Sequence, residues 1–286
     1  MKILVTGANG QLGSELRFLS LTHNNFNWIF IDVNDLDLTD TKNIQSSISK
    51  ISPEIIINCA AYTNVDKAES EPELANLINI KAVDEISKWS YLNNVKLFHI
   101  STDYVFDGNS SSALKEDAKT DPLNIYGLTK LQGEKVCLNN DPNCIIIRTS
   151  WVYSSFGKNF VKTISSLMSE KASLNIINDQ IGSPTYAKDL AEVIIKIINS
   201  KDWIPGLYHY SNEGEVSWFD FAKSIKKYFG FSTDLYQIST DEYPAPAKRP
   251  SYSLLDTSKI KTTFNIKVPS YESSLEKCIK ILKNEK

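Results

Sequence analysis

The sequence has few of the residues from which metal sites and disulfide frameworks are built. Its 286 residues include 4 cysteines and 3 histidines. The cysteines form no CxxC pair and stand at positions 59, 137, 144 and 278. Because structural zinc sites need closely spaced ligands and disulfide scaffolds need many cysteines, we expect reduced thiols and no metal site.

An excess of one charge is also missing. The chain has 31 basic and 34 acidic residues, a formal net charge of −3 and a sequence pI of about 5.7. A surface that binds nucleic acid or anionic lipid needs a basic patch, so we expect neither partner. No run of about 18 apolar residues occurs, and the apolar stretch after Met1 is too short for a signal peptide. The sequence therefore predicts a soluble, cytoplasmic protein.

What the first half does contain is an alternation of short apolar runs with longer amphipathic stretches, the pattern typical of βαβ units. The short runs are rich in Ile and Val, as in strands buried on both faces of a parallel sheet. We expect strands at 3–6, 28–32, 54–59, 96–101 and 144–149, and helices near 11–21, 41–51, 73–93 and 123–138. The prediction is an α/β fold with a doubly wound parallel sheet of the Rossmann type.

After about residue 150 the pattern loosens. Helices are expected near 158–170, 187–200, 217–229 and 272–283, with strand-like runs at 174–177 and 206–210. We predict a dinucleotide-binding domain over residues 1–150 and a smaller C-terminal α/β lobe over 151–286 that mainly binds substrate. The 187–200 helix is a candidate to return to the first domain.

A glycine motif stands between the first expected strand and the helix that follows it. Gly7, Gly10 and Gly13 form GxxGxxG. Residues without Cβ let the backbone turn sharply and approach a pyrophosphate, whose charge is then stabilised by the N-terminus of the helix. The spacing also fits a tight turn without a ligand. We predict that these glycines, with Gln11 and Leu12, bind a dinucleotide.

The second expected strand ends on an acid. Asp32 lies 19 residues after Gly13, where a carboxylate can accept hydrogen bonds from the adenosine ribose and would repel a 2′-phosphate. This favours NADH over NADPH, although a nearby cation would weaken the preference and Asp32 also fits a plain turn. Asp37 and Leu38 are placed to lie under the adenine.

A tyrosine and a lysine share one face of the helix expected after residue 123. Tyr126 and Lys130 are spaced i, i+4. Reduction of a ketone by hydride leaves an alkoxide that needs a proton, and a phenol whose pKa is lowered by an adjacent ammonium can donate it. Lys130 is also placed to hold the nicotinamide ribose. An exposed Tyr–Lys pair without function remains the alternative.

Two further strand ends carry candidate residues, because ligands of open α/β sheets gather at the carboxyl ends of strands. Thr102 is placed to donate a hydrogen bond to a substrate carbonyl, although it also fits a turn cap. Small residues after the third expected strand would let a cofactor lie close, or pack without a ligand. This segment contains Ala60, Ala61, Tyr62 and Thr63.

Together these motifs resemble the extended short-chain dehydrogenase/reductase superfamily and, within it, the dTDP-4-dehydrorhamnose reductase family. The resemblance covers almost the whole chain. It rests on TGANGQLG at 6–13, NCAAYTNVDKAE at 58–69, STDYVF at 101–106, PLNIYG at 122–127, RTSWVY at 148–153, NDQIGSPT at 178–185 and RP at 249–250.

The resemblance implies NADH- or NADPH-dependent reduction of the 4-keto group of dTDP-4-dehydro-β-L-rhamnose to dTDP-L-rhamnose, a sugar donor for surface polysaccharide. By motif position Tyr126 would donate the proton, Thr102 would stabilise the transition state and Lys130 would bind the cofactor ribose. The dTDP-sugar would contact Tyr126 together with Thr102, Asp103 and Trp151. Without the resemblance, Trp151 also fits a core position.

Some members of this family bind Mg²⁺ at a dimer interface through acids on two helices. Glu15 matches the first of these acids, but the later pair reads Lys188 and Asp189. A lysine in place of a carboxylate leaves Mg²⁺ doubtful, so we predict no metal, while a homodimer stays possible.

Two other functions remain open at this stage. One is a related 4-ketosugar-nucleotide reductase that forms a 6-deoxy-L-talose by attack on the opposite ketone face. The other is a non-catalytic, dinucleotide-binding regulatory subunit, against which the intact pair of Tyr126 and Lys130 argues.

Overall fold

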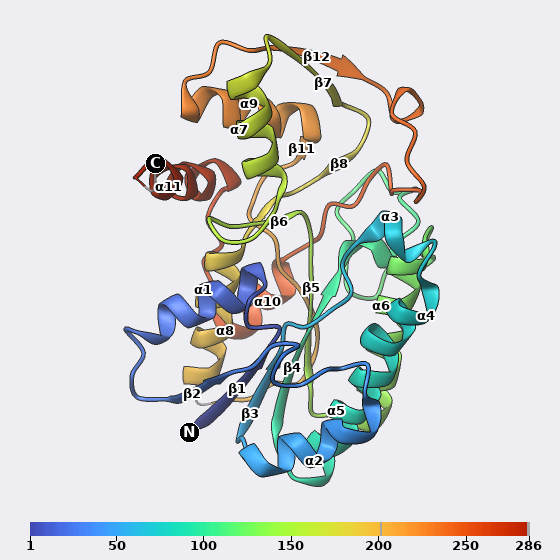
Figure 1. Ribbon diagram of the computed structural model, residues 1–286, viewed down its shortest axis with the longest axis vertical. Helices are drawn as coiled ribbons and strands as arrows, with labels where there is room; N and C mark the ends of the chain where they lie inside the picture. The colour runs from blue at the N-terminus through green and yellow to red at the C-terminus, as the bar shows by residue number, and fades with distance from the viewer. Residues whose placement is uncertain (201, 285–286) are drawn as a thin grey trace.

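The computed structural model describes residues 1–200 and 202–284 and is built around a six-stranded parallel sheet (Figure 1). The strand order is β10-β5-β4-β3-β1-β2. The bounds are β1 (Lys2–Thr6), β2 (Asn27–Phe30), β3 (Ile55–Asn58), β4 (Lys96–Thr102), β5 (Ile145–Thr149) and β10 (Gly206–His209). All neighbours pair in parallel, so the predicted doubly wound α/β fold is confirmed.

Alternate side chains of the sheet enter two apolar cores, one on each face. Ile3, Ile55 and Ile147 pack under α1 (Gln11–Ser20), α8 (Ala187–Asn199) and α10 (Ser258–Phe264). Leu4, Ile56 and Ile146 pack under the helices of the other face, which are α2 (Thr41–Ile51), α5 (Ala82–Leu92) and α6 (Ile125–Asn140). Burial on both faces explains why the strands read as continuous apolar runs rather than as alternating ones.

The helix expected at 73–93 contains a break that the sequence pattern does not reveal. It runs as α4 (Pro72–Asn76), a π-helical turn η1 (Leu77–Lys81) and α5. The turn places the buried Asn79 side chain against the backbone of Tyr62 and the hydroxyl of Thr129. The hydrogen bonds of Asn79 therefore tie the segment after β3 to helix α6. A short helix, α3 (Val65–Ala68), precedes this run.

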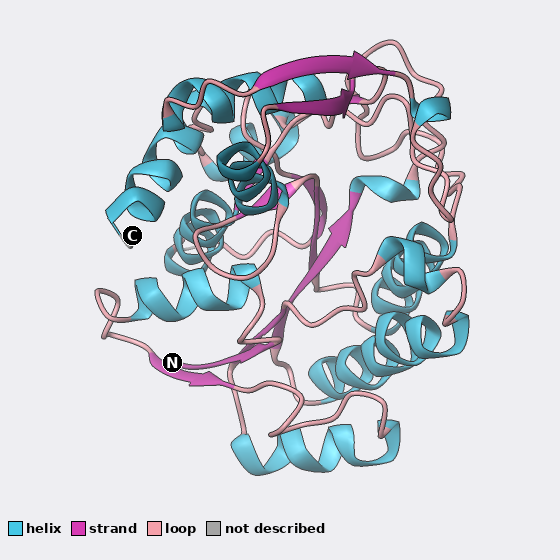
Figure 2. Ribbon diagram, turned by 45° about the horizontal axis from the view of Figure 1, so that its top comes forward, coloured by secondary structure: helices cyan, strands magenta, loops and turns pink. Residues whose placement is uncertain are grey.

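The second part of the chain forms a smaller assembly above the carboxyl ends of the strands (Figures 1 and 2). Its strands pair two by two, β6 with β9, β7 with β12 and β8 with β11. Its helices pack around one apolar core. The bounds are β6 (Val152–Tyr153), α7 (Phe160–Glu170), β7 (Ser173–Ile177), β8 (Ile181–Gly182), β9 (Thr185–Tyr186), β11 (Val216–Ser217), α9 (Trp218–Phe229), β12 (Asp234–Ile238) and α11 (Tyr271–Asn284).

One run lies elsewhere than the sequence pattern suggests. Residues 206–210, grouped above with the second part, supply β10 at the edge of the central sheet, where Leu207 pairs with Ile146. The preceding helix α8 packs in the same core as α1. The chain therefore returns from the smaller assembly to the central sheet and then enters the smaller assembly a second time. The division into residues 1–150 and 151–286 stays a prediction. Among the described residues, none of the helices is long and apolar enough to cross a membrane.

Candidate active site

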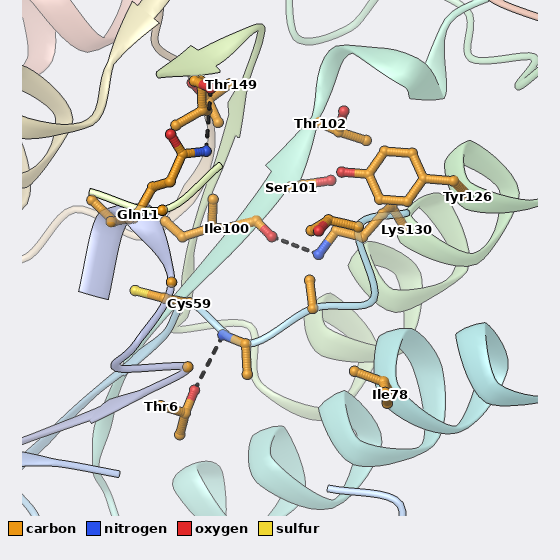
Figure 3. Close-up of a pocket in the computed structure, with 18 of the residues that line it drawn as sticks. Thr6, Gln11, Cys59, Ile78, Ile100, Ser101, Thr102, Tyr126, Lys130 and Thr149 are labelled. Carbon is orange, nitrogen blue, oxygen red and sulfur yellow. Dashed lines mark hydrogen bonds between the residues drawn. The ribbon is translucent and has the colours of Figure 1, made fainter. Parts of the chain in front are cut away.

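A cavity of about 970 Å³ opens at the carboxyl ends of the central strands. It lies where β1 and β3 are neighbours although the connections from them run in opposite directions, the place at which open α/β sheets bind ligands. Residues at the ends of β1, β3, β4 and β5 line it (Figure 3). Side chains from the second part of the chain complete the lining.

The glycine loop forms one wall of this cavity. Gly7 has a left-handed φ of +62°, and a Cβ there would lie 2.7 Å from the backbone of Ala60. Gly10 caps α1 without a side chain, so the N-terminus of this helix is left to a ligand. Gly7, Gly10, Gln11 and Leu12, for which the sequence predicts dinucleotide binding, line the cavity.

Gly13 has a different place from the one predicted. It is not among the residues that line the cavity, and a Cβ there would lie 2.5 Å from the carbonyl oxygen of Gly7. Its lack of a side chain lets α1 pack against the loop. Gly13 therefore shapes the loop from behind, and its predicted part in dinucleotide binding stays a prediction.

The acid predicted at the end of β2 lies two residues beyond that strand and faces the glycine loop. Asp32 Oδ2 accepts a hydrogen bond from the backbone N–H of Asn9 at 2.7 Å, and both residues line the cavity. Asn9 was not singled out from the sequence, although it stands inside the motif. Asp37 and Leu38 also line the cavity. The Thr39 backbone and hydroxyl both donate to Asp37, which lowers the pKa of this carboxyl.

The segment after β3 approaches the cavity through its small residues. Ala60, Ala61 and Thr63 line it, and Tyr62 does not. The Tyr62 hydroxyl donates to Glu71 at 2.5 Å, and its backbone is held by Asn79. The predicted cofactor contact of this segment therefore falls to Ala60, Ala61 and Thr63 in the cavity wall, and that of Tyr62 stays a prediction.

Tyr126 and Thr102 meet at the inner wall. Asn124 caps α6 by accepting from the backbone N–H of Gly127 at 2.8 Å, which fixes the start of the helix one residue before Tyr126. Burial raises the pKa of Tyr126 to about 12, while a hydrogen bond with Thr102 lowers it. The phenol is therefore protonated at neutral pH, as a proton donor must be.

Lys130 lies beside Tyr126 but is directed elsewhere (Figure 3). Its Nζ donates to the carbonyl oxygen of Ile100 at 2.6 Å, and its side chain is buried. Burial lowers the pKa of Lys130 to about 8. The lowered phenol pKa that the sequence suggested is thus not seen in this structure, since burial dominates at Tyr126 and the amino group points to the strand.

Asp103 follows Thr102 in the cavity wall and is fully buried. Its Oδ1 accepts from the Thr102 hydroxyl at 3.1 Å, and its Oδ2 has no hydrogen-bond partner within the described residues. Burial raises the pKa of Asp103 to about 6.

The second part of the chain contributes a pair of stacked indoles. Trp151 has a φ of +46°, rare for a bulky residue, and stacks on Trp218 with ring centroids 3.6 Å apart. Both line the cavity. Trp218 was missed from sequence, where the only sign was its place directly after Ser217, the cap of α9.

The acids considered for a metal are already engaged by protein groups. Glu15 accepts from Ser154 at 2.6 Å, and burial raises its pKa. Asp189 accepts from Asn212 at 2.7 Å and from Ser274. Lys188 lies over the Phe18 ring. This arrangement gives no reason to place a metal ion there.

The raised pKa of Asp103 leads to a prediction about stability. Between roughly pH 4 and 6 the folded protein holds the Asp103 proton more tightly than the unfolded chain, so this group's contribution to the free energy of unfolding falls as the pH rises through about 6. The Asp103→Asn variant cannot ionise and should lose this part of the slope. Urea unfolding of both proteins from pH 4 to 7 measures it, and parallel curves would contradict the prediction.

The chain is similar to proteins of one known family over almost its whole length. The family model of the RmlD substrate binding domain matches residues 1–284. The dTDP-4-dehydrorhamnose reductase of Aggregatibacter actinomycetemcomitans is 39% identical over 96% of this chain and 97% of its own length. Among solved structures, a dTDP-4-dehydrorhamnose reductase from Clostridium acetobutylicum is 39% identical with a TM-score of 0.94, covering 99% of this chain and 100% of its own. The dTDP-4-dehydrorhamnose reductase of Bacillus anthracis, solved in complex with NADP, is 39% identical with a TM-score of 0.94, covering 98% and 99%.

Proposed function

Because this chain belongs to the RmlD substrate binding domain family, we propose that it is an NAD(P)H-dependent oxidoreductase that reduces dTDP-4-dehydro-β-L-rhamnose to dTDP-L-rhamnose. The observation that carries the proposal is that Thr102, Tyr126 and Lys130 line one cavity with the glycine loop, in a chain that matches these reductases over its full length.

The cofactor is a nicotinamide dinucleotide, which supplies the hydride when bound. Gly7, Gly10 and the N-terminus of α1 would hold its pyrophosphate, where a Cβ at Gly7 would meet the Ala60 backbone. The small side chains of Ala60 and Ala61 would let the cofactor lie close to the cavity wall beside this loop. Lys130 would hold the nicotinamide ribose.

The proton comes from Tyr126. The buried phenol carries it at Oη, and Thr102 stabilises the developing alkoxide with a hydrogen bond. Asp103 would contact the sugar nucleotide from the cavity wall, and Trp151 and Trp218 offer it a flat apolar face. Because burial raises the pKa of the phenol, Tyr126 keeps its proton until an alkoxide forms.

Asp32 favours NADH over NADPH within this proposal. Its carboxylate stands beside the glycine loop and would repel a 2′-phosphate. The Asp32→Ser variant should raise kcat/KM for NADPH relative to NADH by about tenfold, which corresponds to removing one like-charge contact in a partly screened site. Steady-state rates with both cofactors measure the ratio.

The matched control is Asp40→Ser, which removes a charge from the same segment at a position that does not line the cavity. It should leave the cofactor ratio unchanged. A ratio that moves equally in both variants would mean that general charge, not the place of Asp32, sets the preference.

A coupled assay tests the function itself. Enzymatically made dTDP-4-dehydro-L-rhamnose is supplied with NADH or NADPH, nicotinamide absorbance is followed and the product sugar is identified by NMR. Formation of dTDP-L-rhamnose is expected. The C4 epimer would mean the talose-type reductase, and no oxidation of either cofactor would refute both.

A homodimer and a cytoplasmic location complete the proposal. Light scattering tests the first and cell fractionation the second.

A further inference from the structure

Beneath Lys130, three buried polar side chains form a hydrogen-bonded row across the sheet. Thr6, Asn58 and His99 stand at paired register positions on β1, β3 and β4, so their side chains share one face. Their exposed fractions are 2%, 2% and 0%. The Thr6 hydroxyl donates to Asn58 Oδ1 at 2.7 Å, and Asn58 Nδ2 lies 3.1 Å from His99 Nδ1.

The row ends at the amino group of Lys130. His99 Nε2 lies 3.5 Å from Lys130 Nζ, which also donates to the carbonyl oxygen of Ile100. Asn58 and His99 are not among the residues that line the cavity, so they act on the site through the two lining residues at the ends of the row, Thr6 and Lys130. Neither was singled out from the sequence, because their meeting depends on strand register.

The donors and acceptors of this row constrain one another. Burial, followed by the charge of Lys130, lowers the pKa of His99 well below its usual value, so its imidazole is neutral and carries a single N–H. An amide nitrogen can only donate. With Asn58 Nδ2 against Nδ1, the imidazole hydrogen sits on Nε2 and faces Lys130 Nζ. With this tautomer, Nζ can accept the hydrogen bond from Nε2 only when Lys130 is an uncharged amine.

A half-turn of the Asn58 amide exchanges its oxygen and nitrogen and reverses the row. His99 Nδ1 then donates to the amide oxygen, and Nε2 accepts from the charged ammonium of Lys130. The amide nitrogen donates to the Thr6 oxygen, and the Thr6 hydroxyl turns to the cavity that this residue lines. Each setting therefore matches one charge state of Lys130, and the proton that distinguishes them exchanges with solvent through the cavity.

Three other titratable groups act on Lys130. The charge of Glu134 on α6 raises the pKa of Lys130, and Glu134 is itself paired with Arg148 at 2.7 Å. Burial raises the pKa of Cys59, and a contact with a neighbouring thiol together with burial raises that of Cys137, so both stay uncharged near neutral pH. His99 is thus the neighbouring group whose tautomer can change with the charge of Lys130.

We propose that His99 is a positioning residue for Lys130: fixed by Asn58 and Thr6, its imidazole holds the amino group at the cavity wall, keeps it charged near neutral pH and changes tautomer when that charge is lost. The importance of this for turnover rests on the proposed function, in which Lys130 binds the cofactor ribose beside Tyr126. The placement of the row is independent of it.

Two variants distinguish the contribution of His99 Nε2 from that of His99 Nδ1. In His99→Gln the longer side chain places an oxygen near the position of Nε2 and retains an acceptor for Lys130. In His99→Asn the shorter side chain retains a partner for Asn58 alone. The pKa of Lys130 is read by NMR of ¹³C-labelled lysine without substrate, with the signal assigned through Lys130→Met.

We expect His99→Asn to lower the pKa of Lys130 by about one unit, a tenfold change in the protonation constant, because the ammonium loses an acceptor. His99→Gln should stay within about half of that shift. The alkaline limb of the pH–rate profile should move to lower pH, and it should move further in His99→Asn than in His99→Gln. Equal Lys130 titrations in wild type and both variants would overturn the proposal.

A measurement on the wild-type protein keeps the inference testable if a variant fails to fold. The chain has 3 histidines, so ¹⁵N NMR resolves the tautomer of His99 directly. The hydrogen should move from Nδ1 to Nε2 as Lys130 loses its proton, and a tautomer that stays constant through that titration would overturn the link. Neither NMR experiment needs turnover, so failure of the coupled assay would refute the proposed function alone.

Discussion

The Tyr126→Phe variant should lose at least about 100-fold in turnover, since general acid catalysis commonly contributes that much. The phenol is buried and protonated, and a benzene ring of the same shape leaves the wall beside Thr102 in place. Dinucleotide binding should therefore survive. Turnover in the coupled assay and cofactor affinity by fluorescence titration check the two halves of this expectation.

The control for this variant is Tyr91→Phe, which removes a hydroxyl from an exposed tyrosine of α5 far from the cavity lining. It should turn over at the wild-type rate. If Tyr126→Phe did the same, Tyr126 would be excluded as the proton donor. If it also lost cofactor binding, the fall in rate would reflect a damaged site instead of a missing proton.

The Arg148→Met variant should lose about 3–5 kcal/mol in the free energy of unfolding, because it leaves the Glu134 carboxylate buried without its counter-ion. The pair is 97% buried on both sides, with exposed fractions of 3%, and its N–O distance is 2.7 Å. Arg148 Nε makes a second hydrogen bond to the same carboxylate at 2.8 Å. Urea unfolding at neutral pH measures the loss.

The double variant Arg148→Met with Glu134→Leu provides the comparison. Replacing both charges by apolar groups of similar size removes the unpaired carboxylate, so it should be more stable than Arg148→Met alone. A single variant that unfolds within about 1 kcal/mol of wild type would show that water or the Ser101 hydroxyl compensates the charge.

The parts of the fold that could be predicted from sequence are those set by neighbours along the chain. Ile-rich runs predict the buried strands. The position of the glycine motif between a strand and a helix predicts the glycine loop. The four-residue spacing of Tyr126 and Lys130 likewise follows from helix geometry alone. For the same reason the cavity contains most of the residues expected there.

The parts that could not be predicted depend on contacts between distant segments. Tyr62 turns from the cavity because Glu71 and Asn79 hold it, and Asn79 is aimed by a π-helical turn that has no sequence pattern. Trp218 reaches the site only because α9 packs beside Trp151. The direction of Lys130 is set by the carbonyl of Ile100, a backbone atom that no side-chain motif reveals.

The return of the chain to the sheet through α8 and β10 means that neither half of the sequence is a self-sufficient building block. A protein cut after residue 150 would end with β5 as an open edge strand, since its neighbour β10 comes from residues 206–209. It would also lack α8 over one face of the sheet. An edge of unpaired backbone beside a bare apolar face invites association with other chains. Engineers who wish to exchange the smaller assembly between related proteins would therefore have to leave α8, β10 and α10 with the recipient and graft three separate segments around them.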